Sequence, residues 1–236
     1  MLSRVHPILI LKTGALGDVL RTTSILPGLH ARYAGCRVTW VTAPGAVDLV
    51  RLHPLVPEVV ALDMHSDEDF RRVQARLGMT TWDRLLSFDD EEPMCRLASS
   101  LQTHRISGAH LAPDGRRAYT PDTAPWFRMG LLSELGKHAA DRLKIENRKS
   151  HGQIYAEMLG LAPGKPHLPR ERASERFAEA FAHRNELAEH GPVVGLNTGA
   201  GGRWQSKALP VQRVAVLVVS LSLSVDGHVT FLLLGG

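Results

Sequence analysis

Short apolar runs alternate with helical patterns along the first hundred residues of the chain. Residues 7–12 form a continuous apolar run, which is typical of a parallel strand buried on both faces, and further strands are predicted at residues 37–42, 58–62 and 84–88. After the first strand, apolar residues recur at helical spacing between Val19 and Leu29. Further candidate helices, which follow the later strands, lie at residues 46–51, 67–77 and 93–101. Ser66 is placed to cap the helix at residues 67–77. Strands that alternate with helices predict βαβ units, and therefore a parallel, doubly wound α/β sheet.

The pattern changes after residue 119. The apolar residues of the segment 119–161 predict two helices with no strand between them. A run rich in proline and charge starts at Ala162 and predicts a linker into a helix at residues 173–187. We therefore divide the chain into an N-terminal Rossmann-like domain at residues 1–162, a linker and connecting helix at 163–190, and a second domain at 191–236.

The second domain begins with another buried-strand pattern, at residues 193–197. A glycine-rich loop, a helix from Pro210 and a strand at residues 228–234 follow. Pro210 suits a first helical turn, where no backbone donor is needed. The segment 191–236 is shorter than an independent domain of about 50 to 200 residues. We expect this domain to be incomplete, because the chain ends where a strand would turn into its next helix.

Composition excludes several classes of protein. The chain has 236 residues, 44% of them hydrophobic and 22% charged, which excludes a disordered or collagen-like chain. Cys36 and Cys95 form no CxxC pair or Cys/His cluster, so we expect neither disulfides nor structural zinc. The N-terminal apolar run is too short for a signal peptide, and no stretch reaches the roughly 20 apolar residues of a membrane span. These features predict a cytoplasmic protein.

The net charge of +4 is mild for this length, and the basic residues are scattered. A solvated surface accounts for this charge; a preference for anionic ligands or for the inner membrane surface stays open as an alternative. The sequence has no basic stripe with interleaved aromatic residues and no zinc-finger or RNP-like pattern. Nucleic acid is therefore not an expected partner.

One candidate site is the loop from Lys12 to Asp18, which follows the first predicted strand. Doubly wound sheets bind ligands at this edge. Gly14 and Gly17 let the backbone approach a ligand, and the helix N-terminus that follows attracts anions. Asp18 can be a helix cap or first-turn acid, or a general base toward a substrate hydroxyl. Spacing does not choose between these roles.

A second candidate site is the loop from Asn197 to Lys207. It has three glycines, two hydroxyl residues, an arginine and a lysine before a helix, a combination suited to a diphosphate. A surface turn is the alternative. Neither GxGxxG nor GxxxxGK[ST] matches, which disfavours a dehydrogenase and a P-loop NTPase. The twelve histidines form no HExxH motif, and no Gly-x-Ser-x-Gly elbow occurs.

Both loops lie in motifs that resemble a known family. Residues 8–29, ILILKTGALGDVLRTTSILPGL, resemble the N-terminal signature of glycosyltransferase family 9, the ADP-heptose:lipopolysaccharide heptosyltransferases. Residues 193–210, VVGLNTGAGGRWQSKALP, resemble the start of that family's donor domain, and residues 126–130 and 147–161 resemble its connecting helices. The resemblance implies a GT-B fold of two Rossmann-like domains, the first binding the acceptor and the second the nucleotide-sugar.

The resemblance also implies roles for individual residues. Asp18 matches the family's proposed general base, which takes a proton from an acceptor hydroxyl as that hydroxyl attacks the anomeric carbon with inversion. Lys207 matches a lysine that meets the donor phosphates, and its charge would stabilise the departing ADP without a metal. The remaining matches are Lys12, Thr13, Gly14 and Gly17 on the acceptor side, and Thr198, Gly199, Gly201 and Gly202 on the donor side. As an alternative, Lys12 only keeps the end of the strand soluble through its charge.

The sequence departs from the family pattern in two places. Family members usually carry two small hydroxyl residues where Gly14 and Ala15 stand, and the later acidic and Asp-Thr-Gly-like donor elements have no counterpart before the chain ends. We expect a monomeric inverting glycosyltransferase that moves heptose from ADP-heptose to a lipopolysaccharide inner-core acceptor, at the inner face of the inner membrane. The alternatives are a truncated, inactive remnant that binds only acceptor or phosphate, and a partner chain that completes the sheet.

Overall fold

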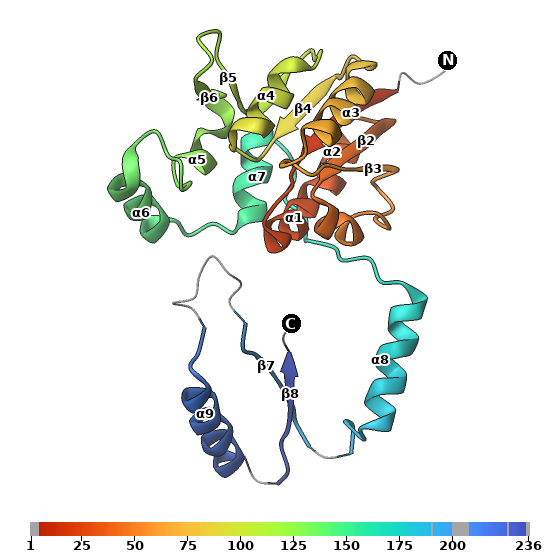
Figure 1. Ribbon diagram of the computed structural model, residues 1–236, viewed down its shortest axis with the longest axis vertical. Coiled ribbons are helices and arrows are strands. Elements are labelled where there is room, and N and C mark those ends of the chain that lie inside the picture. The colour runs from red at the N-terminus through yellow and green to blue at the C-terminus, as the bar shows by residue number, and fades with distance from the viewer. Residues whose placement is uncertain (1–4, 190, 200–207, 226, 235–236) are drawn as a thin grey trace. The chain divides into compact units, whose positions relative to one another are not determined.

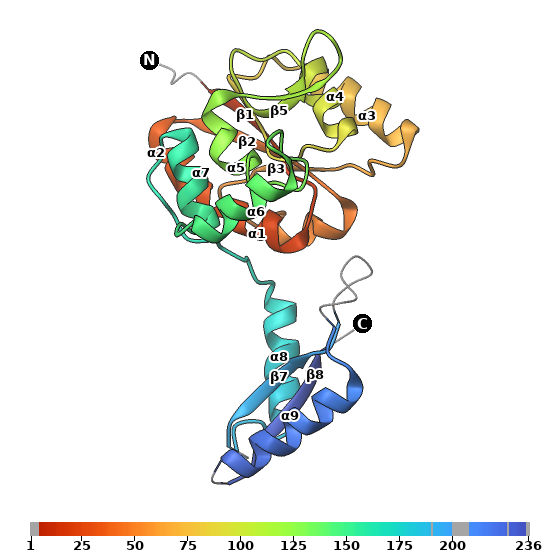
Figure 2. The ribbon, with the colours of Figure 1, turned by 90° about the vertical axis from the view of Figure 1, so that its left-hand side faces the viewer.

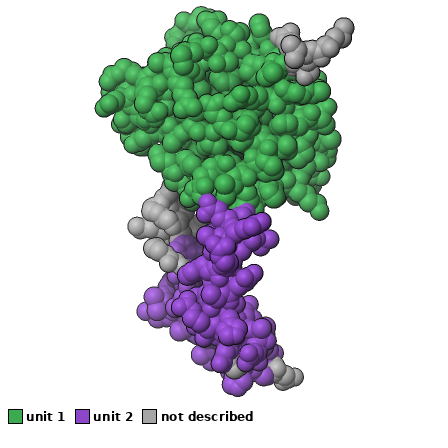
Figure 3. All heavy atoms as spheres, turned by 90° about the vertical axis from the view of Figure 1, so that its right-hand side faces the viewer, with its two compact units in different colours: residues 1–169 green, residues 170–236 purple. Residues whose placement is uncertain are grey.

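The computed structural model describes residues 5–189, 191–199, 208–225 and 227–234 of the chain. The chain divides into two compact units, residues 1–169 and residues 170–236, which Figure 1 shows as a ribbon and Figure 3 distinguishes by colour. The division falls inside the segment 163–190, which the sequence predicts as a linker and connecting helix. Each unit has a sheet of its own.

The described part of the first unit contains one six-stranded sheet in the order β3-β2-β1-β4-β5-β6. Strands β1 to β5 are parallel, and β6 pairs antiparallel with β5 at the edge. The predicted parallel, doubly wound sheet is confirmed. Its strands are β1 (His6–Leu11), β2 (Cys36–Thr42), β3 (Glu58–Ala61), β4 (Arg84–Ser87), β5 (Ile106–Leu111) and β6 (Arg117–Tyr119).

Helices cover both faces of this sheet (Figure 2). They include α1 (Leu16–Thr22), α2 (Leu26–Arg32), α3 (Asp67–Gly78), α4 (Glu92–Ser100) and α7 (His151–Leu159). In β1, Ile8 and Ile10 pack in the core cluster that contains α1, α2 and α7. The alternate residues Leu9 and Leu11 pack in the cluster that contains α3 and α4. Because successive side chains of a strand point to opposite faces, a strand between two helical layers must be apolar throughout.

Local sequence signals account for several element boundaries. Ser66 caps α3, because its Oγ accepts a hydrogen bond from the backbone N–H of Asp69 at 3.2 Å, as predicted. The helix predicted at residues 46–51 is instead a 3₁₀ helix, Pro44–Leu49. Pro44 occupies its first turn, where the missing backbone donor costs nothing.

The middle of the chain differs from the sequence prediction in two ways. Strands β5 and β6 are not among the predicted elements; in β5, serine, glycine and histidine interrupt the apolar run. The segment 119–161 contains three helices rather than two, namely α5 (Ala124–Phe127), α6 (Gly136–Glu146) and α7. Helix α6 escapes prediction because it buries only Ala140 and has no apolar stripe.

The described part of the second unit contains α8 (Arg172–Arg184), β7 (Val193–Asn197), α9 (Val211–Ser224) and β8 (Thr230–Leu234). Strands β7 and β8 are parallel neighbours, as expected for a βαβ unit. Pro210 precedes α9 as its N-cap rather than lying in its first turn. Among the described residues of this unit, Leu196 is the only buried apolar side chain.

Both cysteines lie in the first unit, and both are buried free thiols. Cys36 begins β2, and Cys95 lies in α4. Burial raises the pKa of the Cys95 thiol to about 11. Each thiol therefore packs as a small apolar side chain.

Gly108 supports a stability prediction, because it pairs with Ser87 across β4 and β5 at a φ of 129°. A Cβ at this position would lie 1.8 Å from the Ser87 carbonyl oxygen. We expect Gly108→Ala to lower the free energy of unfolding by about 3 kcal/mol or more, because backbone strain and a backbone clash add. Urea denaturation measures this loss.

Gly115→Ala is the matched control. Gly115 also has positive φ, at 78°, but an added Cβ there meets no atom within 4 Å. We expect a loss of about 1 kcal/mol from the left-handed backbone alone. Equal losses in the two variants would contradict the clash at Gly108.

Candidate active site

The loop after β1 begins with backbone contacts that fix its path. The backbone N–H of Lys12 donates to the Val41 carbonyl at 3.1 Å, and Trp40 Nε1 donates to the Lys12 carbonyl at 3.2 Å. Beyond this point Gly14 and Gly17 face open space, since an added Cβ at either meets nothing within 4 Å. Packing does not require glycine at these two positions, so the open backbone is accessible to a ligand.

A buried ion pair joins this loop to the end of β4. Lys12 Nζ donates to Asp89 Oδ1 and to the Gly14 carbonyl. Asp89 Oδ2 accepts from the backbone N–H of Thr13 and from Thr13 Oγ1, the latter at 2.7 Å. The Lys12 and Asp89 side chains are each only 6% exposed. Strand-end solubility therefore does not explain Lys12, which pairs with Asp89 inside the protein.

Asp18 lies in the first turn of α1, where Ala15 is the N-cap. It is therefore a first-turn acid and not the cap. Its side chain is 34% exposed, and Arg21 Nη1 lies 3.2 Å from Oδ1. His151 Nδ1 lies 3.9 Å from the same oxygen. Among the described residues, Oδ2 has no hydrogen-bond partner, so it is available to accept a proton from a hydroxyl group.

His151 lies beside Asp18, at the start of α7, and packs against two aromatic rings. Its ring lies 4.5 Å from the Trp126 ring and 4.1 Å from the Tyr155 ring, centroid to centroid. The imidazole is only 7% exposed, and neither of its nitrogens has a hydrogen-bond partner in the described part of the chain. Burial, together with the charges of Lys12 and Arg21, lowers the pKa of His151 to about 4.

The start of α7 is held by a capping box. Ser150 Oγ accepts from the Gln153 backbone N–H at 3.3 Å, and Gln153 Oε1 accepts from the Ser150 backbone N–H at 2.8 Å. This reciprocal pair fixes the first turn and therefore the direction of the His151 side chain. A cavity of about 280 Å³ lies beside the start of α7 and is lined by Arg21, Ser150, His151, Gly152, Gly164 and Pro166.

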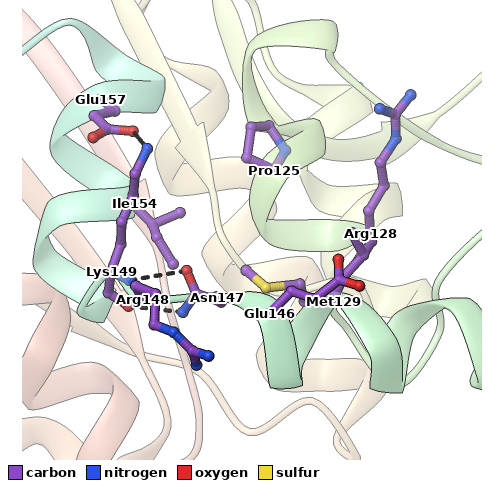
Figure 4. Close-up of a pocket in the computed structure, with 10 residues that line it drawn as sticks. Pro125, Arg128, Met129, Glu146, Asn147, Arg148, Lys149, Ile154 and Glu157 are labelled. Atoms are coloured by element: carbon purple, nitrogen blue, oxygen red, sulfur yellow. Dashed lines mark hydrogen bonds and ion pairs between the residues drawn. The ribbon is translucent and has the colours of Figure 1, made fainter.

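A larger cavity of about 510 Å³ lies between α5, α6 and α7 (Figure 4). Met129 and Ile154 are among its apolar lining residues, and its charged lining consists of Arg128, Arg148 and Lys149 together with Glu146 and Glu157. In Figure 4, Lys149 reaches Glu157, and their charged groups lie 2.5 Å apart. An apolar lining with charged groups of both signs suits a ligand that has both apolar and charged parts.

The second candidate loop begins at the carboxyl end of β7. The Thr198 backbone N–H donates to the Leu234 carbonyl at 3.4 Å, and the Gly199 backbone N–H donates to Asn197 Oδ1 at 3.2 Å. Gly201, Gly202 and Lys207 lie outside the described residues. The structure thus brings together the predicted residues of the first loop, while the donor-side residues belong to the second unit.

Sequence reasoning missed Asp89, Arg21 and His151. A signal for Asp89 was present, because it follows the strand that neighbours β1, and the carboxyl ends of parallel strands meet at one edge. His151 gave no such signal: it lies in the segment 147–161 that resembles a connecting helix, but it is separated from Asp18 by more than one hundred residues and no pattern links the two.

No family model matches the chain. A curated relative, lipopolysaccharide heptosyltransferase 1 of Pseudomonas aeruginosa, is 22% identical over 183 residues, which cover 68% of this chain and 50% of that protein. The crystal structure of the glycosyl transferase family 9 protein from Veillonella parvula DSM 2008 matches with a TM-score of 0.68 and 17% identity, over 98% of this chain and 62% of that one. The resemblance to glycosyltransferase family 9 is confirmed.

Two further solved structures of this kind come from E. coli. ADP-heptose lps heptosyltransferase II matches with a TM-score of 0.59 and 16% identity, over 98% of this chain and 64% of that one. Heptosyltransferase WaaC with ADP matches with a TM-score of 0.54 and 17% identity, over 98% of this chain and 67% of that one. The predicted α/β fold of GT-B type is confirmed. The chain spans half the length of the curated relative from Pseudomonas.

The described residues contain neither a metal-ligand cluster nor a membrane-spanning helix. In residues 5–189, 191–199, 208–225 and 227–234, no group of three or more His, Cys, Asp or Glu side chains is arranged to hold a metal ion. None of the helices within those ranges has the length and apolar character needed to cross a membrane.

The buried pair predicts a large, non-additive loss of stability. Lys12→Met leaves the Asp89 carboxylate buried without its cation, and we expect a loss of about 3–5 kcal/mol in the free energy of unfolding. Adding Asp89→Asn should recover a substantial part of that loss, because the unpaired charge is removed. A double-mutant cycle in urea tests this, and additive losses would contradict a coupled pair.

His151 predicts a loss of stability in acid. Its pKa is about 4 in the folded chain, against 6.5 for an unperturbed histidine, so the unfolded chain binds more protons between these values. The stabilisation is complete above pH 6.5 and is lost as the pH falls to about 4, by up to about 3 kcal/mol. His151→Phe should flatten this part of the stability profile relative to the wild type. Equal slopes in the variant and the wild type would contradict the assignment.

Proposed function

We propose that this chain acts as an inverting glycosyltransferase, with heptose of ADP-heptose as the transferred sugar and a lipopolysaccharide inner-core hydroxyl as the acceptor. The observation that carries the proposal is Asp18, whose Oδ2 is open while Oδ1 faces Arg21 and His151. Three relatives support the sugar and the pathway by name: lipopolysaccharide heptosyltransferase 1, ADP-heptose lps heptosyltransferase II, and WaaC, solved with ADP and with ADP-2-deoxy-2-fluoro heptose.

In the proposed reaction, Asp18 Oδ2 removes the proton of the acceptor hydroxyl as its oxygen attacks the anomeric carbon. The new carbon–oxygen bond forms while the bond from the anomeric carbon to the diphosphate breaks, and the electron pair leaves with ADP. The Lys12–Asp89 pair keeps the loop in place, and the open backbone at Gly14 and Gly17 gives the acceptor room.

The donor side of the proposal rests on the loop after β7. Backbone donors from Thr198 to Gly202 would contact the diphosphate, and Lys207 would stabilise the charge that develops on the leaving ADP. These groups supply positive potential themselves, so the proposal includes no metal ion or other cofactor.

The larger cavity suggests where an amphiphilic acceptor and its membrane would contact the first unit. Leu131, Leu132, Leu135 and Ile145 are exposed, on or next to α6. Exposed apolar side chains beside cations such as Arg128 and Arg148 suit the surface of an anionic membrane. We therefore propose a cytoplasmic monomer that contacts the inner face of the inner membrane.

A second candidate function is a binding domain without turnover. The observation that favours it is the small core of the second unit, where Leu196 is the only buried apolar residue among those described. Such a protein would bind acceptor or phosphate through the first unit and would not transfer sugar.

Asp18→Asn tests the proposal. We expect turnover of ADP-heptose with a lipopolysaccharide core acceptor to fall by roughly 10² or more, with donor affinity nearly unchanged, because only proton removal is lost. Asp114→Asn, at an exposed turn, is the matched control. Unchanged turnover in Asp18→Asn would remove Asp18 from the role.

Two further results separate the candidates. Lys207→Ala should weaken binding of the ADP-sugar, and normal donor affinity would count against the phosphate role. Acceptor binding by the wild-type chain without any transfer would favour the binding domain over the enzyme.

A further inference from the structure

The environment of His151 is not explained by packing. A buried imidazole usually has a hydrogen-bond partner on at least one nitrogen, because an unsatisfied buried polar group costs free energy. Here both nitrogens are without one in the described part of the chain, although the ring is only 7% exposed. Trp126 and Tyr155 enclose the ring, so it has little freedom to turn toward solvent.

The Asp18 carboxylate is an acceptor close to this imidazole. His151 Nδ1 lies 3.9 Å from Asp18 Oδ1, which is beyond a hydrogen bond, while the Asp18 side chain is one-third exposed and able to adjust. In unliganded enzymes such contacts are often long and shorten when substrate binds. Arg21 contacts the same oxygen, so a second donor on Oδ1 would leave Oδ2 free for an acceptor hydroxyl.

We propose that His151 is a positioning residue, which donates a hydrogen bond from Nδ1 to Asp18 Oδ1 and so orients Oδ2 toward the acceptor hydroxyl. This inference rests on the proposed function of Asp18. A neutral donor orients the carboxylate without adding a second full positive charge beside Arg21, which would weaken Asp18 as a base.

The groups around His151 favour the neutral form. The groups that act on His151 are Asp18 and Arg21 on α1, Lys12 after β1, Trp126 on α5 and Tyr155 on α7. Lys12 is itself paired with Asp89. The cations Lys12 and Arg21 disfavour a proton on the ring, as does burial. The imidazole is thus neutral near pH 7 and carries one N–H, whose position the proposal assigns to Nδ1.

Three substitutions of His151 separate positioning from packing. His151→Asn keeps an amide N–H near the place of Nδ1 but loses the ring, His151→Gln places its amide near Nε2, and His151→Phe keeps a ring without nitrogen. We expect kcat to fall roughly tenfold or more in His151→Phe and His151→Gln, with the donor KM little changed. His151→Asn should retain most of the wild-type rate. The acidic limb of the pH–rate profile should shift to higher pH in Phe and not in Asn.

A packing role gives the opposite order. His151→Phe would then be the mildest change and His151→Asn the most harmful, and this result would overturn the proposal. His104→Phe, at an exposed site, is the control for nonspecific effects. Thermal melts of all variants show whether a lower rate reflects loss of folded protein.

A readout that needs no activity separates this inference from the proposed function. Nitrogen-15 NMR of the wild-type imidazole reports which nitrogen carries the proton. We expect the Nδ1–H form in the wild type and a shift toward Nε2–H in Asp18→Ala, which leaves no side-chain acceptor at this position. An Nε2–H form in an active wild type would overturn the role of His151 and leave the enzyme proposal intact. The Nδ1–H form in an inactive wild type would support the contact between His151 and Asp18 and would overturn the enzyme proposal.

Discussion

The buried pair of Lys12 and Asp89 is the contact on which the candidate site depends. Two charges removed from water must satisfy each other and their remaining hydrogen-bonding capacity, or the fold loses several kcal/mol. Asp89 does so with Lys12 and with both donors of Thr13, so the ends of two neighbouring strands are joined at the start of the loop. The first turn of α1 comes directly after these anchored residues, so the buried pair also helps to fix the position of Asp18 on that turn.

Much of the first unit could be predicted from local pattern. The run at β1 is apolar at every position because both faces are covered, and the glycine-bearing loop before α1 is visible in sequence. The pairing of Lys12 with Asp89 could not be read in this way, because it joins residues 77 positions apart. The contacts among the rings of Trp126, His151 and Tyr155 likewise depend on how α5 and α7 pack, and no motif predicts them.

The two units differ in how far they bury their apolar residues. In the first unit, β1 is covered on both faces, and its residues 8–11 are fully buried. In the second unit, α9 has no buried residue, and Val211 and Leu223 are each at least 80% exposed. The hydrophobic effect therefore stabilises the first unit far more strongly than the described part of the second. The proposed proton acceptor lies on the better packed unit, where its orientation can be fixed.

The burial of both thiols has a practical consequence for studying motion. Cys36 is 8% exposed and Cys95 is fully buried, and thiolate, the form that reacts with maleimide dyes, is disfavoured at Cys95 by its raised pKa. A cysteine introduced at an exposed position would thus be the main attachment point for a fluorophore in the native chain. Pairs of such positions, one in each unit, would allow the distance between the units to be followed by energy transfer while the two native cysteines are kept.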